Sequence, residues 1–343
     1  MRTISKAGEI FPMSPAVDDD AAGALLFSDR EGRLLFETYA YEVGFFRFNW
    51  HPSLEILMVL RGSLNSYSEN GVRLLRENDF LVINPNVGHA SILLEPKTVA
   101  LVIHISQGYL EELCEGNPVP TFSCWSGQDE EKERAVYEQI RRSTALVFCS
   151  MQRGEAANRL MAQSQIFLIL SLLMKNFSEE APSTRAAADH LKQGEIVHSM
   201  VKYINRRFRE KLTLEQLAAY VNRNPSYISN YFRQATGLGF HDYLIRKRLT
   251  YAAYLLHNSD DSILDIALDA GFPDAKALNQ AFKKYFQISP GQYRRRLLEN
   301  GDKSVRQLFP VKLEFDDPLL ARKLKEYLSS PTGENHRETP KKP

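Results

Sequence analysis

The pattern of apolar and polar positions in residues 213–243 recurs in residues 262–293. The first segment reads TLEQLAAYVNRNPSYISNYFRQATGLGFHDY and the second reads SILDIALDAGFPDAKALNQAFKKYFQISPGQY. In both, apolar residues return at the spacing of an amphipathic helix, a turn follows, and a second amphipathic stretch begins. Thr213 and Ser262 supply capping hydroxyls at the start of each copy. The pattern predicts two helix-turn-helix units in tandem.

The second helix of each copy is predicted to expose side chains that pair with base edges or phosphates. Asn224 and Pro225 make a strong helix start, because Asn caps and Pro fits the first helical position. Asn, Gln, Arg and Lys are suited to contacts in the major groove. The predicted DNA-binding residues are Ser226, Tyr227, Asn230 and Arg233 in the first copy and Lys276, Ala277, Gln280, Lys283 and Lys284 in the second. Because these faces differ, one chain should read two unlike sub-sites.

The residues between the copies, FHDYLIRKRLTYAAYLLHN, fit one further helix. About 17 helical residues would be roughly 25 Å long. Such a strut could hold the two recognition helices about one DNA turn, ~34 Å, apart. It carries Arg246, Lys247 and Arg248, and we predict that Arg246 contacts DNA.

The charge distribution supports binding to a polyanion. Residues 191–300 contain 17 Lys and Arg against 10 Asp and Glu, a net charge of +7. Residues 1–190 contain 17 against 25, a net charge of −8. A chain with an overall charge of +1 therefore has a basic segment where the repeat lies, as binding to phosphates requires.

The first half of the chain has a different pattern. Short runs rich in Val, Ile, Leu and Phe over residues 35–105, interrupted by Gly, Asn, Asp and Pro, predict a small β-barrel. Residues 129–149 and 155–177 read as two amphipathic helices. The apolar run IFLILSLLM in the second is nine residues long, shorter than the ~20 that a bilayer requires. We expect this surplus apolar surface to pack on the barrel, to pair two protomers, or to do both.

The strings LTLEQLAAYV, NPSYISNYFRQATG and FKKYFQISPGQYRRR resemble the AraC/XylS family of bacterial transcription regulators over about residues 200–299. The resemblance implies binding to double-stranded DNA through two helix-turn-helix units joined by a helix. It also implies a homodimer, and activation, with RNA polymerase as a partner, more often than repression. The second recognition helix departs from the usual Ser, aromatic, Phe, Ser, Arg at Lys276, Ala277, Leu278, Asn279 and Gln280. The resemblance therefore implies the binding mode and not the operator sequence.

The stretches NWHPSLEILMVLRG and RENDFLVINPNVGHA resemble a cupin barrel, the usual sensor module of that family. The cupin pattern surrounds a metal with two His, a Glu and a later His. Asn49 replaces the first His here, and the spacing before His89 is one residue short. A metal needs three or four converging ligands, so we expect neither a metal nor another cofactor. A polar effector pocket, an occluded barrel and a metal site remain the alternatives.

Strand alternation places Arg47, Asn49, His51 and Glu55 on one face, which could line the barrel interior. By analogy with related regulators, a sugar is a plausible effector class, although fold does not determine the ligand. The predicted effector-binding residues are Arg47, Asn49, Trp50, His51, Glu55 and His89.

Together these patterns predict an α+β chain with an N-terminal cupin-like β-barrel and an all-α C-terminal domain. The expected parts are a sensing domain with an N-terminal arm (1–128), a helical dimerisation segment (129–178), a linker (179–191), a tandem helix-turn-helix domain (192–299) and a C-terminal extension with a disordered end (300–343). We expect a cytoplasmic DNA-binding regulator that is not an enzyme and does not associate with membranes. The competing hypotheses are a metal-dependent cupin enzyme with an accessory helical domain and an effector-independent dimeric DNA-binding protein.

Overall fold

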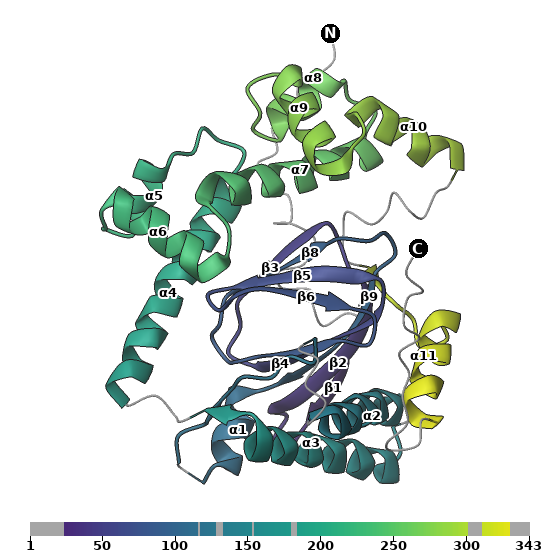
Figure 1. Cartoon of the computed structure of the whole chain (residues 1–343). Coiled ribbons are helices and arrows are strands. Elements are labelled where there is room, and N and C mark those ends of the chain that lie inside the picture. Colours follow the sequence, from purple (N-terminus) through teal and green to yellow (C-terminus); the bar gives the residue numbers. More distant parts are fainter. Residues whose placement is uncertain are drawn as a thin grey trace, which may run out of the picture.

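The structure is a computed structural model that describes residues 24–115, 117–127, 133–152, 154–179, 184–300 and 311–329. A β-barrel lies at the centre, with helices on two opposite sides of it (Figure 1). The predicted α+β fold, with a β-rich N-terminal part and a helical C-terminal part, is confirmed. The expected N-terminal arm and the expected disordered end after residue 329 lie outside the described residues.

Two antiparallel sheets face each other to form the barrel. The larger sheet has the order β1-β2-β9-β4-β7, with β12 added to β2, and the smaller has the order β3-β8-β5-β6. The larger sheet comprises β1 (Leu25–Ser28), β2 (Leu34–Glu42), β9 (Val99–Ile105), β4 (Leu54–Arg61), β7 (Phe80–Ile83) and β12 (Val311–Lys312). The smaller comprises β3 (Phe46–Asn49), β8 (His89–Leu93), β5 (Ser63–Ser68) and β6 (Gly71–Arg76). A further short pair joins β10 (Thr121–Phe122) to β11 (Ser178–Glu179).

The central strands of the larger sheet are buried on both faces. In β4, Ile56 and Met58 point to the outer core, which is shared with the helices. Their neighbours Leu57 and Val59 point to the interior core between the two sheets. Because alternate residues of a strand face opposite sides, a strand covered on both sides reads as a continuous apolar run, as LEILMVLR does.

Helices α1 (Gln107–Leu113), α2 (Arg134–Met151) and α3 (Ala156–Asn176) lie beneath the larger sheet (Figure 1). Helix α3 has 21 residues and, by length and composition alone, could cross a membrane. The apolar part of this helix is therefore longer than the nine-residue run IFLILSLLM that was recognised in the sequence. One face, including Ile166, Ile169 and Leu173, is buried in the same core as α2 and the sheet. Only 28% of the apolar window of α3 is buried, so the helix packs on the sheet by one face and leaves the other exposed.

The C-terminal half contains the two helix-turn-helix units. The helices are α4 (Thr184–Arg207), α5 (Leu214–Tyr220), α6 (Pro225–Thr236), α7 (Phe240–Asn258), α8 (Ile263–Asp269), α9 (Ala275–Phe286) and α10 (Pro290–Asn300). The α5–α6 and α8–α9 pairs form the units, and α7 joins them. The side chains of Thr213, Asn224 and Ser262 accept backbone hydrogen bonds as caps, and Asp274 caps α9.

The boundaries between the parts differ from the expected ones in one place. Helix α4 begins at Thr184, inside the segment 179–191 that was expected to be a linker. The small and polar residues of TRAAADHLKQ suggested a linker. The same residues are mostly strong helix formers, so the segment can also begin a helix.

The segment after the second helix-turn-helix unit returns to the barrel (Figure 1). Strand β12 pairs with β2 opposite Tyr41 and Glu42, and α11 (Pro318–Ser329) packs on α2. The hydroxyl of Tyr327 donates to Asn78 Oδ1 at 2.7 Å, and Lys323 Nζ lies 2.5 Å from Glu77 Oε1. The helix-turn-helix domain is therefore connected to the barrel at both of its ends.

Candidate DNA-reading faces and effector site

The two recognition helices present most of the predicted DNA-binding residues to solvent. Amphipathic spacing buries Ile228 and Phe232 of α6 and Leu278 and Phe282 of α9. The exposed side chains are Ser226, Tyr227, Asn230 and Arg233 on α6 and Lys276, Gln280, Lys283 and Lys284 on α9, whereas Ala277 is half-buried. The structure thus offers two exposed faces of unlike chemistry.

Arg246 does not lie on either exposed face. Its Nε donates to Asp242 Oδ2 at 2.9 Å, and its guanidinium lies over the rings of Tyr285 at 4.7 Å and Phe45 at 5.4 Å. Its side chain is only 13% exposed. The prediction that Arg246 contacts DNA is not supported in this arrangement, because the residue is enclosed between α7, α9 and the barrel.

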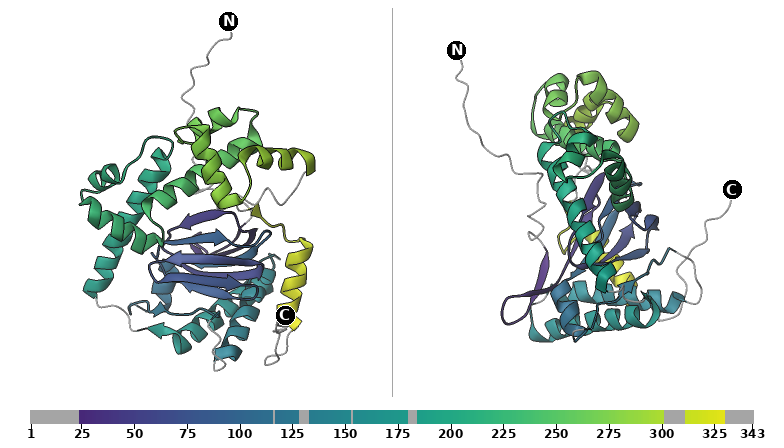
Figure 2. Two further views of the ribbon diagram at one scale, coloured as in Figure 1. Left: turned by 45° about the horizontal axis from the view of Figure 1, so that its top comes forward. Right: turned by 90° about the vertical axis from the view of Figure 1, so that its left-hand side faces the viewer.

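The helix-turn-helix domain docks on the outer face of the smaller sheet, and both views in Figure 2 show these elements stacked. Phe46 and Phe48 of β3 contact the Tyr243 ring edge-to-face, with centroids 5.3 and 5.8 Å apart. Ala90 and Ile92 of β8 share the same core. The barrel and the DNA-binding domain therefore share one continuous apolar core.

Trp50 belongs to this domain interface and not to the barrel interior. Its ring lies 4.8 Å from that of His198 on α4, and a Cβ added to Gly194 would lie 3.2 Å from Trp50 Nε1. The structure therefore does not bring Trp50 together with the other predicted effector-binding residues, although it directly follows Asn49 in the sequence.

Inside the barrel, polar groups from both sheets converge on one carboxylate. Strand register places Glu37 and Glu55 on either side of His104 across β2, β9 and β4. Glu55 Oε2 lies 2.9 Å from His51 Nε2, 3.1 Å from His89 Nε2 and 3.1 Å from His104 Nε2. His51, Glu55 and His104 form a group that could hold a metal ion.

Two members of this cluster, His104 and Glu37, were missed in the sequence. His104 is the one imidazole in the apolar strand VALVIHI, and that contrast is a signal that could have identified it. Its neighbours are known only once the register of three strands is known. The predicted residues His51, Glu55 and His89 are brought together, although His89 appeared poorly spaced.

The cluster perturbs the protonation of its members. Burial would raise the pKa of Glu55, but interaction with His89 and hydrogen bonds from His104 and His51 outweigh burial and hold that pKa well below its usual range. Burial would lower the pKa of His104, but hydrogen bonds with Glu37 and Glu55 raise it to about 9. Burial lowers the pKa of His51. Without a metal, Glu55 is an anion and His104 is a cation near neutral pH.

The remaining predicted residues also face the interior. Arg47 Nε donates to Asn49 Oδ1 at 2.9 Å, and its guanidinium lies 5.8 Å from the centre of the Tyr41 ring. The Ser66 hydroxyl is buried without a hydrogen-bond partner among the described residues. Cationic, amide and hydroxyl groups beside the histidine cluster suit a polar ligand.

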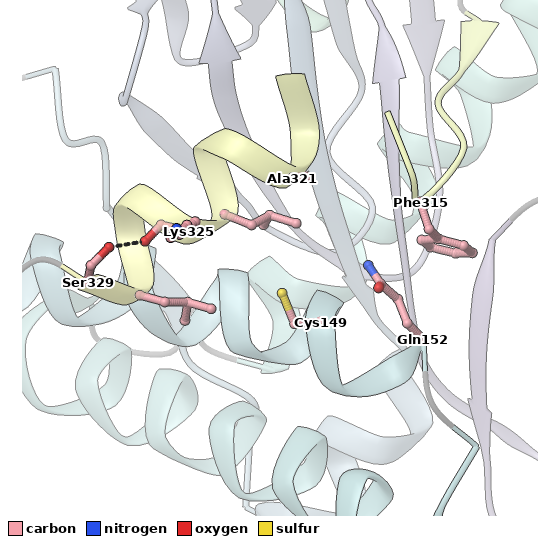
Figure 3. Close-up of a pocket in the computed structure, with 8 residues that line it drawn as sticks. Cys149, Gln152, Phe315, Ala321, Lys325 and Ser329 are labelled. Atoms are coloured by element: carbon pink, nitrogen blue, oxygen red, sulfur yellow. Dashed lines mark hydrogen bonds between the residues drawn. The ribbon is translucent and has the colours of Figure 1, made fainter. Parts of the chain in front are cut away.

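A separate groove of about 400 Å³ lies between α2 and α11 (Figure 3). Its lining is mostly apolar and consists of Cys149, Gln152, Phe315, Ala321, Leu324, Lys325, Leu328 and Ser329. No residue predicted to bind an effector lines it, so it is distinct from the polar cluster.

Comparisons with known proteins divide the chain in the same way. A family model described as an AraC-like ligand binding domain matches residues 34–170, and one described as a helix-turn-helix domain matches residues 217–296. An uncharacterized HTH-type transcriptional regulator of Staphylococcus aureus is 27% identical over 245 residues, which are 71% of this chain and 31% of that protein. The Msm operon regulatory protein of Streptococcus mutans is 29% identical over 150 residues, 42% of this chain and 51% of that protein.

The chain therefore spans about a third of the length of the first relative and about half of the second. Among solved structures, the C-terminal domain of AraT, a response regulator from Geobacillus stearothermophilus, is 35% identical. That match covers 32% of this chain and 92% of that one, with a TM-score of 0.30.

Proposed function

Because the chain belongs to the AraC/XylS family of transcriptional regulators, with an AraC-like ligand-binding domain and a helix-turn-helix DNA-binding domain, we propose that it is a cytoplasmic, effector-controlled activator. The family consists of DNA-binding regulators and not of enzymes. The proposed partners are double-stranded DNA, a small effector in the barrel, a second copy of the chain, and RNA polymerase at the promoter.

One observation carries the effector-controlled part of this proposal: β3 and β8 each have two functional faces. Arg47, Asn49 and His89 face the barrel interior, whereas Phe46, Phe48, Ala90 and Ile92 of the same strands contact the helix-turn-helix domain. A ligand that moves the inner side chains displaces the outer ones across a single sheet. Such a ligand shifts the equilibrium only if it prefers one arrangement of the two domains.

The interior chemistry favours a hydroxyl-bearing effector, and we propose a sugar. Arg47, Asn49, Ser66 and the histidine cluster provide donors and acceptors, while Tyr39 and Tyr41 provide ring faces in the interior core. Thermal stabilisation of the purified protein across a panel of sugars and other metabolites would identify the effector class. A panel in which only apolar compounds stabilise the protein would contradict the proposal of a sugar.

We propose that α3 forms the dimer contact. Its outer face exposes Leu160, at 69%, together with Met161 and Phe167, whereas its opposite face is buried against α2 and the sheet. Large exposed apolar side chains grouped on one helix face are typical of a protein interface.

Mobility-shift titration tests the DNA-binding part. The target is a DNA fragment selected from random sequence by the unaltered protein. Removing a base or phosphate contact is expected to cost about 1–3 kcal/mol, so Arg233→Ala and Lys283→Ala should weaken binding about tenfold each. Arg322→Ala is the matched control, because Arg322 is equally basic and exposed but lies on α11. Full affinity and sequence discrimination in both α6 and α9 variants would refute the assignment of the reading faces.

A further inference from the structure

The three histidines of the barrel interior share one tautomer. His51 Nδ1 lies 3.1 Å from the carbonyl oxygen of Ser53, and His89 Nδ1 lies 3.1 Å from that of Val87. His104 Nδ1 lies 2.8 Å from Glu37 Oε1. Carbonyl and carboxylate oxygens only accept hydrogen bonds, so each Nδ1 carries the proton that is donated.

With this tautomer, the contacts between the three Nε2 atoms and Glu55 are unfavourable unless a further ligand lies between them. In a neutral imidazole, each Nε2 then has a lone pair, and all three point at the anionic Glu55 Oε2 from 2.9–3.1 Å. His89 Nε2 is buried and has no hydrogen-bond partner in the described part of the chain. Protonating His104 alone satisfies one of these contacts and leaves the other two, whereas protonating all three rings would gather three cations in a buried site, which is costly.

We propose that this cluster is a binding site for one divalent first-row transition metal ion, held by His51, His104 and Glu55, whose ligand atoms all lie within 4.8 Å of one another, with His89 as a fourth ligand beside the same carboxylate oxygen. A cation at the point of convergence accepts the imidazole lone pairs and the carboxylate together. Ligand atoms that each lie about 2.0–2.2 Å from a metal are separated by about 3.0–3.4 Å, close to the 2.9–3.1 Å that separate Glu55 Oε2 from each Nε2. Three imidazoles and one carboxylate suit zinc, iron, cobalt or nickel better than magnesium or calcium.

The surroundings are those of a metal site and not of a surface histidine patch. Each ligand imidazole donates its other N–H to an acceptor, which orients the ring and makes it a better ligand. Glu37 orients His104 and does not reach the metal itself. Two carboxylates and a divalent ion sum to zero charge, so the bound site buries no net charge.

Three strands and one loop contribute to this site, which explains why the sequence pattern did not show it. His104 and Glu55 come from the larger sheet, His89 comes from the smaller sheet, and His51 lies between β3 and β4. A metal would therefore join the two sheets at one end of the barrel. The inference goes beyond DNA binding and would hold whether or not the metal is the signal to which the regulator responds.

Cobalt titration of the full chain tests the proposal without DNA, so its failure is distinguishable from a failure of DNA binding. The protein is first treated with a chelator and then titrated with Co²⁺ while visible absorption is recorded. We expect one Co²⁺ per chain, displaced by Zn²⁺. Glu55→Gln and His104→Gln should weaken binding more than about 100-fold, and Glu37→Gln, which acts through His104, about 10- to 100-fold.

His257→Gln is the matched control, because His257 is exposed at the end of α7 and should not alter the titration. If Glu55→Gln does not fold, as judged by circular dichroism, the stoichiometry of the unaltered protein and the Glu37→Gln variant still decide the question. Non-saturable binding by the unaltered protein, or equal losses in the His257 and cluster variants, would overturn the proposal.

Discussion

The docking of the DNA-binding domain on the smaller sheet predicts that Phe46→Ala separates the unfolding of the two domains. Phe46 is 7% exposed, and its ring lies against Tyr243 and beneath Arg246. Truncating a buried Phe costs about 3–5 kcal/mol. Most of that cost falls on the interface, since the side chain faces away from the barrel interior, so undocking becomes about 10²- to 10³-fold more favourable.

Trp50 provides the assay, because it lies in this interface against His198 and the chain has only two tryptophans. In a Trp125→Phe background, emission from Trp50 reports docking, and far-UV circular dichroism reports the folded helices. In urea, the Trp50 transition of Phe46→Ala should precede the circular-dichroism transition, whereas the two coincide without the substitution. Leu26→Ala, at an exposed position of β1, is the control. Coincident transitions in Phe46→Ala would refute the docking argument.

Three other predictions follow from individual contacts. Phe167→Asp should convert a dimer into a monomer, as measured by light scattering. Lys175→Asp, on the exposed end of the same helix, should leave the dimer intact. A dimer that survives Phe167→Asp would exclude the α3 interface. Lys283→Ala should reduce the slope of log affinity against log salt concentration by about one, and an unchanged slope would remove Lys283 from the phosphate contacts. Leu320→Ala, at a fully buried position of α11, should lower the free energy of unfolding by about 2–5 kcal/mol in urea titration. A loss below about 1 kcal/mol would mean that the C-terminal segment does not stabilise the barrel.

The features that depend on local sequence were predictable. Caps at Thr213, Asn224 and Ser262 and the apolar spacing of α6 and α9 involve residues within one or two helical turns. The pattern of such residues is therefore visible in a single segment, and the two helix-turn-helix units are confirmed. That the exposed faces of α6 and α9 read DNA stays a prediction.

The features that depend on tertiary register were not predictable. His104 lies 49 residues from Glu55, and only the pairing of β4 with β9 brings them together. Arg246 and Trp50 were assigned from residue type and neighbourhood, but their surroundings are created by docking between domains. The return of β12 to β2 likewise joins segments from opposite ends of the chain, and no periodic pattern encodes it.

The histidine cluster and the domain interface lie on opposite faces of one strand, and this placement connects the two proposals. His89 points inward to Glu55, while the next residue, Ala90, packs in the core shared with the helix-turn-helix domain. Because side chains alternate across a strand, β8 cannot shift its inner face without moving its outer face. Both ends of the DNA-binding domain are also connected to the barrel, through α4 and through β12. Under the proposed effector control, a movement of β8 would therefore reach the helix-turn-helix domain through the packed sheet.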